Sequence, residues 1–288
     1  MTNKAVGLEA NMSGADAPAP NEPAQLYLDL LKRTLSNWIY GDIEMMPAVA
    51  QKSYKRWVLD WLESKGIQAM RPRPFNPEQR KIGRDLSLGA HTMIGTARLN
   101  NLQYCVETAI KDGVPGDLIE TGVWRGGACI FMRGILKAHG VTDRTVYVAD
   151  SFEGLPPPDE DKYPADKGDK FHTYEYLAIS LEEVQRNFTR YGLLDDQVKF
   201  LKGWFKDTLP TAPMDKIAVA RLDGDMYEST MDALTHLYPK VSPGGFVIID
   251  DYVAFPSCKK AVHDFRTANG IDDEIHEIDW TGVYWRRS

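Results

Sequence analysis

The stretch that most constrains the fold of this chain is residues 116–127, which read Gly-Asp-Leu-Ile-Glu-Thr-Gly-Val-Trp-Arg-Gly-Gly. A short apolar run ends at an acid and a glycine turn, and residues 128–136 then repeat apolar side chains at helical spacing. The pattern predicts a strand, a tight turn and a helix. Glycines in such a turn let the backbone approach a ligand closely, and the helix start offers unpaired N–H groups. An ordinary strand-to-helix turn without a ligand is the simpler alternative.

The glycine spacing, Glu-x-Gly-x-x-x-Gly-Gly, differs from the Gly-x-Gly-x-x-Gly of dinucleotide-binding enzymes. It also places a carboxylate, Glu120, at the end of the strand. A carboxylate at this place repels a pyrophosphate but suits a cationic ligand. S-adenosylmethionine (SAM), which carries a sulfonium and an amino group, is the natural candidate. We expect Glu120, Gly122, Gly126 and Gly127 to line its site.

The size and charge of the chain limit the kind of protein it can be. Its 288 residues are enough for one large α/β domain with a helical appendage. The net charge of −7 argues against a nucleic-acid partner. No apolar stretch is long enough to span a bilayer and the first residues lack the core of a signal peptide, so we expect a cytoplasmic protein with no membrane partner. Three widely spaced cysteines, Cys105, Cys129 and Cys258, indicate buried thiols.

Composition also divides the chain into three parts. Residues 1–23 are rich in Ala, Pro, Asn and Gly and are predicted to be a flexible tail. Residues 24–110 are predicted to be an N-terminal helical cap region, with amphipathic helices over about 25–39 and 47–65 and a third that ends near residue 111. These helices could cover the active site, form a subunit contact, or simply pack on the edge of the sheet. Residues 111–288 are predicted to hold the main α/β domain.

Several residues outside the glycine turn are candidates for the ligand site. Asp150 ends the second predicted strand, where an acid can accept hydrogen bonds from ribose hydroxyls, and Ser151 follows it. His91 and Met93 lie in a loop before a helix and could line the site, although a lone histidine is more often structural. Trp204 follows the third strand and could pack on an adenine, or be an ordinary core aromatic. The acidic run up to residue 170 is expected to be a solvated surface segment or a mobile lid.

Two further apolar strands end in acids. Residues 216–222 lead into Asp223 and Asp225, and residues 244–249 lead into Asp250 and Asp251. Because the carboxyl ends of parallel strands line one crevice, these four acids should converge beside the glycine turn. Such a cluster repels itself unless it binds a cation or shares a proton, and its oxygen ligands suit Mg²⁺. The alternative is that Asp225 and Asp251 cap the helices that follow them.

A divalent cation at this place has a definite chemical use. It can hold a substrate hydroxyl, lower the pKa of that group and orient its oxygen toward the methyl group of SAM. A further aspartate within reach can take the proton. Methyl transfer is an in-line displacement in which protein groups give little covalent help, so positioning supplies much of the acceleration.

Several motifs together resemble those of the macrocin O-methyltransferase (TylF-type) family, from about residue 27 to the C-terminus. The motifs are Ile-Glu-Thr-Gly-Val-Trp-Arg-Gly-Gly at 119–127, Ala-Asp-Ser-Phe-Glu-Gly at 149–154, Asp-Gly-Asp-Met-Tyr-Glu-Ser-Thr at 223–230 and Asp-Asp-Tyr at 250–252. Ala-His-Thr-Met at 90–93 and Trp-Thr-Gly-Val-Tyr-Trp-Arg at 280–286 support the resemblance. Several motifs in the right order are far more specific than one glycine loop.

The resemblance implies a class I SAM-dependent methyltransferase fold, Rossmann-like, with a mostly parallel sheet, helices on both faces and an N-terminal helical appendage. It implies Mg²⁺-dependent methylation of a hydroxyl, typically on a sugar of an antibiotic or related natural product, and at least a homodimer. The family's metal ligands correspond to Asp223, Asp250 and Asp251, and its general base to Asp225, with the roles of Asp223 and Asp225 open to exchange. Glu120 and Asp150 would contact the amino-acid end and the ribose of SAM.

Three other functions remain to be weighed. An NAD-dependent oxidoreductase shares such a sheet, but the glycine spacing and Glu120 count against it. A non-catalytic SAM-binding scaffold would not need to keep four self-repelling acids. An O-methyltransferase acting on a hydroxylated metabolite other than a sugar is the remaining alternative.

Overall fold

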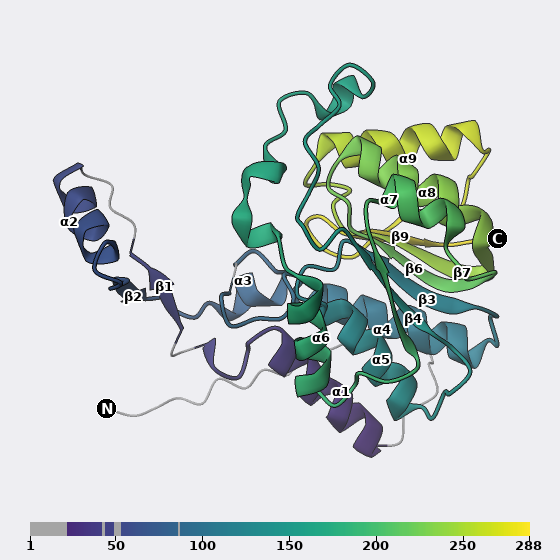
Figure 1. The fold of residues 1–288 in the computed structure, drawn as a ribbon. Coiled ribbons are helices and arrows are strands. Elements are labelled where there is room, and N and C mark those ends of the chain that lie inside the picture. The colour runs from purple at the N-terminus through teal and green to yellow at the C-terminus, as the bar shows by residue number, and fades with distance from the viewer. Residues whose placement is uncertain (1–21, 42–43, 49–52, 86) are drawn as a thin grey trace.

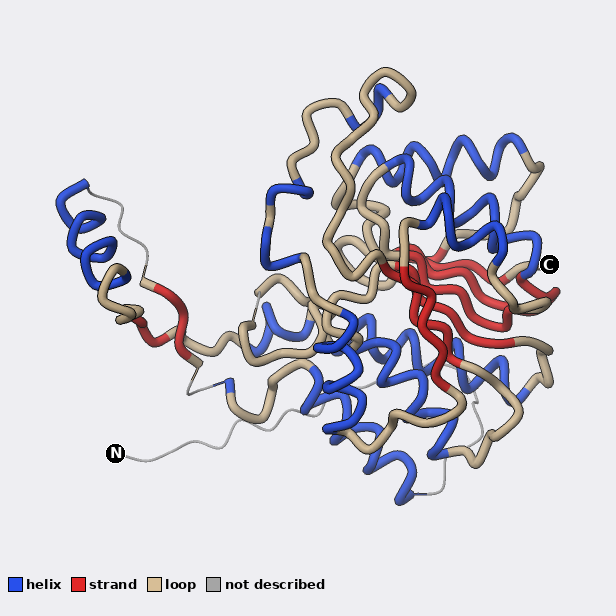
Figure 2. Tube along the Cα trace, in the orientation of Figure 1, coloured by secondary structure: helices blue, strands red, loops and turns tan. Residues whose placement is uncertain are grey.

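The computed structural model describes residues 22–41, 44–48, 53–85 and 87–288 (Figures 1 and 2). Almost all of the predicted tail, residues 1–23, therefore lies outside the described residues. Its last two residues, Glu22 and Pro23, already belong to the first helix, α1 (Glu22–Leu35).

The centre of the molecule is a seven-stranded sheet with the strand order β5-β4-β3-β6-β7-β9-β8. The strands from β5 to β7 are parallel, and β9 and β8 add an antiparallel edge. Their bounds are β3 (Asp117–Thr121), β4 (Val146–Asp150), β5 (Val198–Lys202), β6 (Ile217–Leu222), β7 (Val241–Ile249), β8 (His276–Glu277) and β9 (Val283–Arg286). The sheet confirms the predicted mostly parallel α/β fold.

Helices cover both faces of this sheet because successive side chains of each strand point to opposite sides. Leu118, Val146 and Val148 face one cluster, and Ile119, Tyr147 and Ala149 face the other. Figure 1 shows the two helical layers. The first holds α1, α4 (Thr96–Lys111), α5 (Gly127–Ala138) and α6 (Leu181–Arg190), and the second holds α7 (Phe205–Thr208), α8 (Tyr227–Leu237) and α9 (Pro256–Ala268).

The region before β3 consists of two unlike parts. Helices α1 and α4 pack in the layer with α5, so they belong to the body of the domain. The strands β1 (Met45–Pro47) and β2 (Met70–Pro72) pair antiparallel and carry α2 (Ser53–Glu63), which projects away from the body in Figure 1. We call residues 44–73 the arm. The helix predicted over about 47–65 is described as α2, which is shorter, and Met45–Pro47 belongs to a strand.

The short helix α3 (Pro77–Lys81) joins the arm to the body. Asn76 caps this helix by accepting a hydrogen bond from the backbone N–H of Gln79, and Pro77 is the first residue of the helix. Buried Arg80 donates from one nitrogen to Glu44 at 2.9 Å and from another to Asp85 at 2.8 Å. These ion pairs fix the base of the arm to the body.

The segment between β4 and α6 runs past the carboxyl ends of the strands. It holds three single 3₁₀ turns, Pro164–Asp166, Phe171–Thr173 and Glu175–Leu177. Among the described residues, no helix has both the length and the apolar character required to cross a membrane.

Candidate active site

A cavity of about 310 Å³ opens at the carboxyl ends of β3, β4, β6 and β7. This edge of a parallel sheet is where α/β proteins bind ligands, and the volume lies at the small end of the usual range for ligand pockets. Predicted site residues in its wall are Met93, Glu120, Gly122, Asp150, Ser151, Trp204, Asp223, Asp225, Asp250 and Asp251. Thus most of the residues chosen from the sequence lie around one space.

Gly122 forms the turn after β3 with φ of +80°. A Cβ at this position would lie 1.7 Å from the backbone oxygen of Asp223, so the turns after β3 and β6 pack directly on each other. Only glycine fits this close approach. The turn places its backbone in the cavity wall, as predicted.

Gly126 and Gly127 have a different use. They are outside the cavity wall as far as the described residues define it. A Cβ on Gly126 would lie 2.7 Å from Val184 of α6, and one on Gly127 would lie 2.4 Å from the backbone oxygen of His91. The structure therefore gives these two glycines a packing role at the start of α5, and their contact with a ligand stays a prediction.

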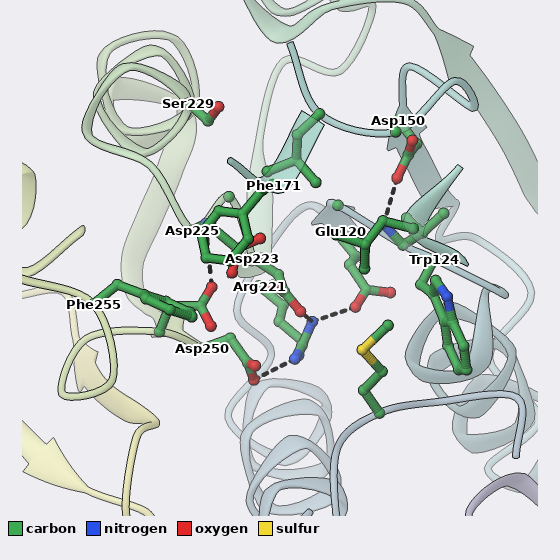
Figure 3. A pocket seen from close by; sticks show the side chains of 18 of the residues that line it. Glu120, Trp124, Asp150, Phe171, Arg221, Asp223, Asp225, Ser229, Asp250 and Phe255 are labelled. Carbon is green, nitrogen blue, oxygen red and sulfur yellow. Dashed lines mark hydrogen bonds and ion pairs between the residues drawn. The ribbon is translucent and has the colours of Figure 1, made fainter. Parts of the chain in front are cut away.

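Asp150 holds the glycine turn in place. Its carboxylate accepts hydrogen bonds from the backbone N–H groups of Val123 and Phe152, each at 2.7 Å (Figure 3 shows the first). Burial raises the pKa of this carboxyl, and these hydrogen bonds oppose the rise. Ser151 turns its hydroxyl to the backbone oxygen of Gly154 at 2.6 Å. Both residues remain in the cavity wall.

Glu120 is buried at the end of β3 and has two side-chain partners. Its carboxylate accepts hydrogen bonds from Arg221 and from the thiol of Cys129, whose Sγ lies 2.8 Å away. Burial raises the pKa of Glu120 to about 7, and the Arg221 charge limits that rise. The thiols of Cys105, Cys129 and Cys258 are free and buried, as predicted.

Three of the four predicted acids converge. Asp223, Asp225 and Asp251 each offer a carboxylate oxygen, and these oxygens lie within 4.8 Å of one another. Burial raises the pKa of Asp223 to about 6, and burial together with repulsion from neighbouring acids raises the pKa values of Asp225 and Asp251 well above the usual range. A divalent cation fits such a group, because it would supply the missing positive charge and prefers carboxylate oxygens.

The alternative role of these acids as helix caps is not what the structure shows. The N-cap positions of α8 and α9 are Met226 and Phe255, so neither Asp225 nor Asp251 takes that position. The carboxylate that accepts from the first N–H groups of α8 is Asp166, at 2.6 Å from the Tyr227 nitrogen.

Asp250, the fourth predicted acid, lies in the same cavity wall and has two cationic partners. This residue was expected as a metal ligand, but its carboxylate pairs with the guanidinium groups of Arg221 and Arg98. Burial opposes ionisation, yet the two arginines hold the pKa of Asp250 below its ordinary value. Asp250 is not among the three acids whose oxygens converge, and its role as a metal ligand stays a prediction.

Sequence reasoning missed Arg221, which connects the two halves of the site. Its guanidinium, 2% exposed, donates to Glu120, Asp223 and Asp250 (Figure 3). A charged residue inside the apolar strand β6 was the available signal, because a buried arginine requires acidic partners. Arg98, at the start of α4, gave no such signal.

Of the remaining candidates, Met93 and Trp204 lie in the cavity wall. His91 is not among the described residues that line the cavity. The Nδ1 atom of His91 lies 2.7 Å from the hydroxyl of Tyr191. Burial and the nearby Arg125 charge lower the pKa of this imidazole. His91 thus has the structural role that the sequence analysis set beside the ligand role.

The segment between β4 and α6 supplies cavity residues that the sequence did not reveal. Phe171, Tyr176 and Leu177 lie in the wall, and the indole nitrogen of Trp124 donates to the backbone oxygen of Tyr176 at 2.9 Å. Phe171 lies against Phe255, which follows β7. Phe171, Tyr176 and Leu177 directly follow the acidic run up to residue 170, which was expected to be a solvated surface segment or a mobile lid, and they form one side of the site.

A parallel sheet with this strand order and a ligand cavity beside an acid-and-glycine turn define a class I SAM-dependent methyltransferase. Residues 24–287 match the family model described as macrocin-O-methyltransferase (TylF), and the chain belongs to this family. It is accordingly a SAM-dependent O-methyltransferase, which removes the oxidoreductase alternative.

Three comparisons support this membership. The chain is 56% identical over 273 residues to mycinamicin III 3''-O-methyltransferase of Micromonospora griseorubida, covering 94% of this chain and 99% of that protein. It is 54% identical over 264 residues to 8-demethyl-8-(2,3-dimethoxy-alpha-L-rhamnosyl)-tetracenomycin-C 4'-O-methyltransferase of Streptomyces olivaceus, covering 91% and 93%. The solved structure of the O-methyltransferase NovP matches with a TM-score of 0.80 and 52% identity over 92% of this chain and 99% of that one.

Proposed function

We propose that this protein transfers the methyl group of SAM to a hydroxyl oxygen of a sugar on a natural-product glycoside, and that it uses Mg²⁺ to do so. The observation that carries the metal-dependent part is the cluster of Asp223, Asp225 and Asp251 in the cavity wall. The sugar acceptor is supported by the mycinamicin and tetracenomycin relatives, of which the second names a rhamnosyl group.

The residues proposed for SAM lie between the glycine turn and Trp204. Gly122 lets the turn after β3 pack directly on the turn after β6, and this places its backbone in the cavity wall. Glu120 is assigned to the amino-acid end, Asp150 and Ser151 to the ribose, Trp204 to the adenine, and Met93 to the opposite wall. Each of these five side chains belongs to the cavity wall.

For the metal, we assign Asp223 and Asp251 as ligands, because Mg²⁺ in proteins is held by one or two carboxylates together with water and substrate oxygens. When bound, the ion would lower the pKa of the acceptor hydroxyl and orient its oxygen. Asp225 is assigned to take the proton. Asp223 is the weaker choice for a base because its Oδ2 lies 2.9 Å from Arg221.

The test compares single variants of the acids. Asp225→Asn should bind SAM normally and lose roughly 10²- to 10⁴-fold in kcat, as expected for a general base. Asp251→Asn should weaken Mg²⁺ binding measured by calorimetry, and EDTA should abolish transfer. Asp143→Asn, an exposed acid at the opposite end of the sheet, is the control.

Two groups of acceptors are tested for methylation. The first group is deoxysugar glycosides, and the second is hydroxylated metabolites without a sugar. Methylation of the second group alone would favour the non-sugar alternative. A wild type that binds SAM but methylates neither group, with or without Mg²⁺, would favour the non-catalytic scaffold.

We also propose that the protein is a homodimer or a higher homo-oligomer, with the arm as a contact. Trp57 and Trp61 of α2 are 70% and 52% exposed. Leu26 and Leu30 of α1 are also exposed, so a second copy could bury apolar surface on both elements. A cytoplasmic location stays a prediction of the sequence.

A further inference from the structure

A row of aromatic rings leads from the acid cluster to the surface. Phe255 packs edge-on against Phe171, with ring centroids 5.0 Å apart. Phe171 packs edge-on against Tyr174 at 6.1 Å, and Tyr174 stacks on Tyr176 at 5.7 Å with an interplanar angle of 17°. Figure 3 shows the inner end of the row, where Phe171 and Phe255 lie beside the acids. We call these four rings the aromatic row.

The two ends of the row have different surroundings. Phe171 and Phe255 lie in the cavity wall near the acids, and Tyr176 also belongs to that wall. Tyr174 and Tyr176 are 43% and 50% exposed. A pair of stacked rings at the mouth of a ligand cavity leaves apolar area in water that a ligand would cover.

The outer rings are held in place by contacts that do not depend on a ligand. The backbone N–H of Tyr174 donates to the Phe171 oxygen, and that of Leu177 donates to the Tyr174 oxygen, both at 3.0 Å. The indole of Trp124 binds the Tyr176 oxygen, and Asp166 ties the same segment to the start of α8. Because these contacts fix the backbone that carries the two rings, a ligand that binds there does not have to order the segment.

The cavity volume indicates what the outer rings would bind. A space of about 310 Å³ is small for a site that must hold both SAM and a sugar ring. The rest of a glycoside must therefore leave through the mouth, where the row continues. Aromatic side chains bind flat ring systems by offset stacking.

We propose that Tyr174 and Tyr176 form a second subsite that binds the aglycone of the acceptor by stacking, with an aromatic, flat aglycone as its preferred ligand. The inner rings, Phe171 and Phe255, border the sugar. The inference rests on the proposed transfer to a glycoside and deepens it, because it names the class of aglycone.

The experiment uses two probes that share one sugar. These are 4-methylumbelliferyl α-L-rhamnopyranoside, which has a flat aromatic aglycone, and methyl α-L-rhamnopyranoside, which has none. Binding of each to the full chain is measured by calorimetry with S-adenosylhomocysteine and Mg²⁺ present. The wild type should bind the aryl glycoside about tenfold more tightly, the size of one good aromatic contact.

The double variant Tyr174→Leu/Tyr176→Leu should remove that preference and leave binding of the methyl glycoside and of S-adenosylhomocysteine unchanged. In turnover, KM for the aryl glycoside should rise about tenfold with kcat unchanged. Tyr40→Leu changes an exposed tyrosine that is not among the residues of the cavity wall, and it should keep the preference.

Two results would overturn the proposal. One is a wild type that binds both glycosides equally. The other is a double variant that keeps the aryl preference, or that loses affinity for both glycosides to the same extent. Failure of the proposed function itself would show differently, as a wild type that does not bind S-adenosylhomocysteine.

Discussion

Arg221 stabilises three carboxylates that would otherwise be buried without a full set of partners. It donates to Glu120, Asp223 and Asp250, and its own side chain is almost completely buried. Removal of one partner from a buried ion-pair network leaves charges uncompensated, which is far more costly than the loss of a surface pair.

We therefore expect Arg221→Met to lower the free energy of unfolding by about 3 to 5 kcal/mol. Arg286→Met, which breaks the exposed pair with Asp112, should cost no more than about 1 kcal/mol. Urea denaturation of both variants measures the difference. Equal losses in the two variants would mean that Arg221 is not needed to compensate the acids.

The acid cluster should also make stability depend on pH. In the metal-free protein the pKa of Glu120 is raised to about 7 and that of Asp223 to about 6, from ordinary values of 4.5 and 3.8. These groups bind protons more tightly in the folded chain than in the unfolded one. Their contribution to the free energy of unfolding is therefore lost as pH rises from about 4 to about 7.

Mg²⁺ should reverse this loss, because it competes with protons for the carboxylates. The rise in Tm on adding Mg²⁺ should be larger near pH 8 than near pH 5. Thermal unfolding with Mg²⁺ or with EDTA at both pH values measures it. A rise of the same size at both values would argue against a carboxylate site for the ion.

At the scale of elements, Asp166 couples the segment between β4 and α6 to α8. Met226, at the N-cap of α8, makes no side-chain cap bond among the described residues. Asp166 accepts instead from the N–H groups of Tyr227 at 2.6 Å and Glu228 at 3.0 Å. A helix cap supplied from about sixty residues away joins two elements that border the same cavity.

Asp166→Ala should cost about 1 to 2 kcal/mol and speed hydrogen exchange both in residues 159–178 and in the first turn of α8. Ser180→Ala removes a local cap, since Ser180 accepts from Glu183 at the start of α6. Ser180→Ala should speed hydrogen exchange only at the start of α6. Hydrogen exchange by mass spectrometry compares the two, and a purely local effect of Asp166→Ala would contradict the coupling.

Elements whose signals are local could be predicted from the sequence. The strands β3, β4, β5 and β6 lie where the patterns placed them. The pairing of β1 with β2 was missed, because Met45–Pro47 and Met70–Pro72 are short and show no alternation that identifies a strand. Their pairing joins segments on either side of α2, which no local pattern encodes.

At the scale of the whole molecule, the arm is the part that most needs a partner. A two-stranded ribbon with one helix is marginal in water by itself, and this helix exposes two tryptophans. Contact with a second copy would cover them.

If the proposed assembly forms through the arm, Trp57→Glu/Trp61→Glu should give a monomer without changing the free energy of unfolding of the body by more than about 1 kcal/mol. Mass from light scattering measures the change. Leu194→Glu, on an exposed leucine of the body, is the control and should leave the mass unchanged. An unchanged mass in the tryptophan variant would show that the arm is not part of the subunit contact.

The sequence by itself determined the type of sheet and the place of the site. Buried parallel strands are read from continuous apolar runs, and the acids and glycines that end those runs must gather at one edge. Only the tertiary structure decided which acids are available to a ligand. Asp250 and Asp251 are adjacent in the sequence, but of these two only Asp250 pairs with Arg221 and with Arg98, which lies 152 residues from it. The charge of a carboxylate in a protein depends on the groups that folding brings to it, and neighbours in the chain do not reveal them.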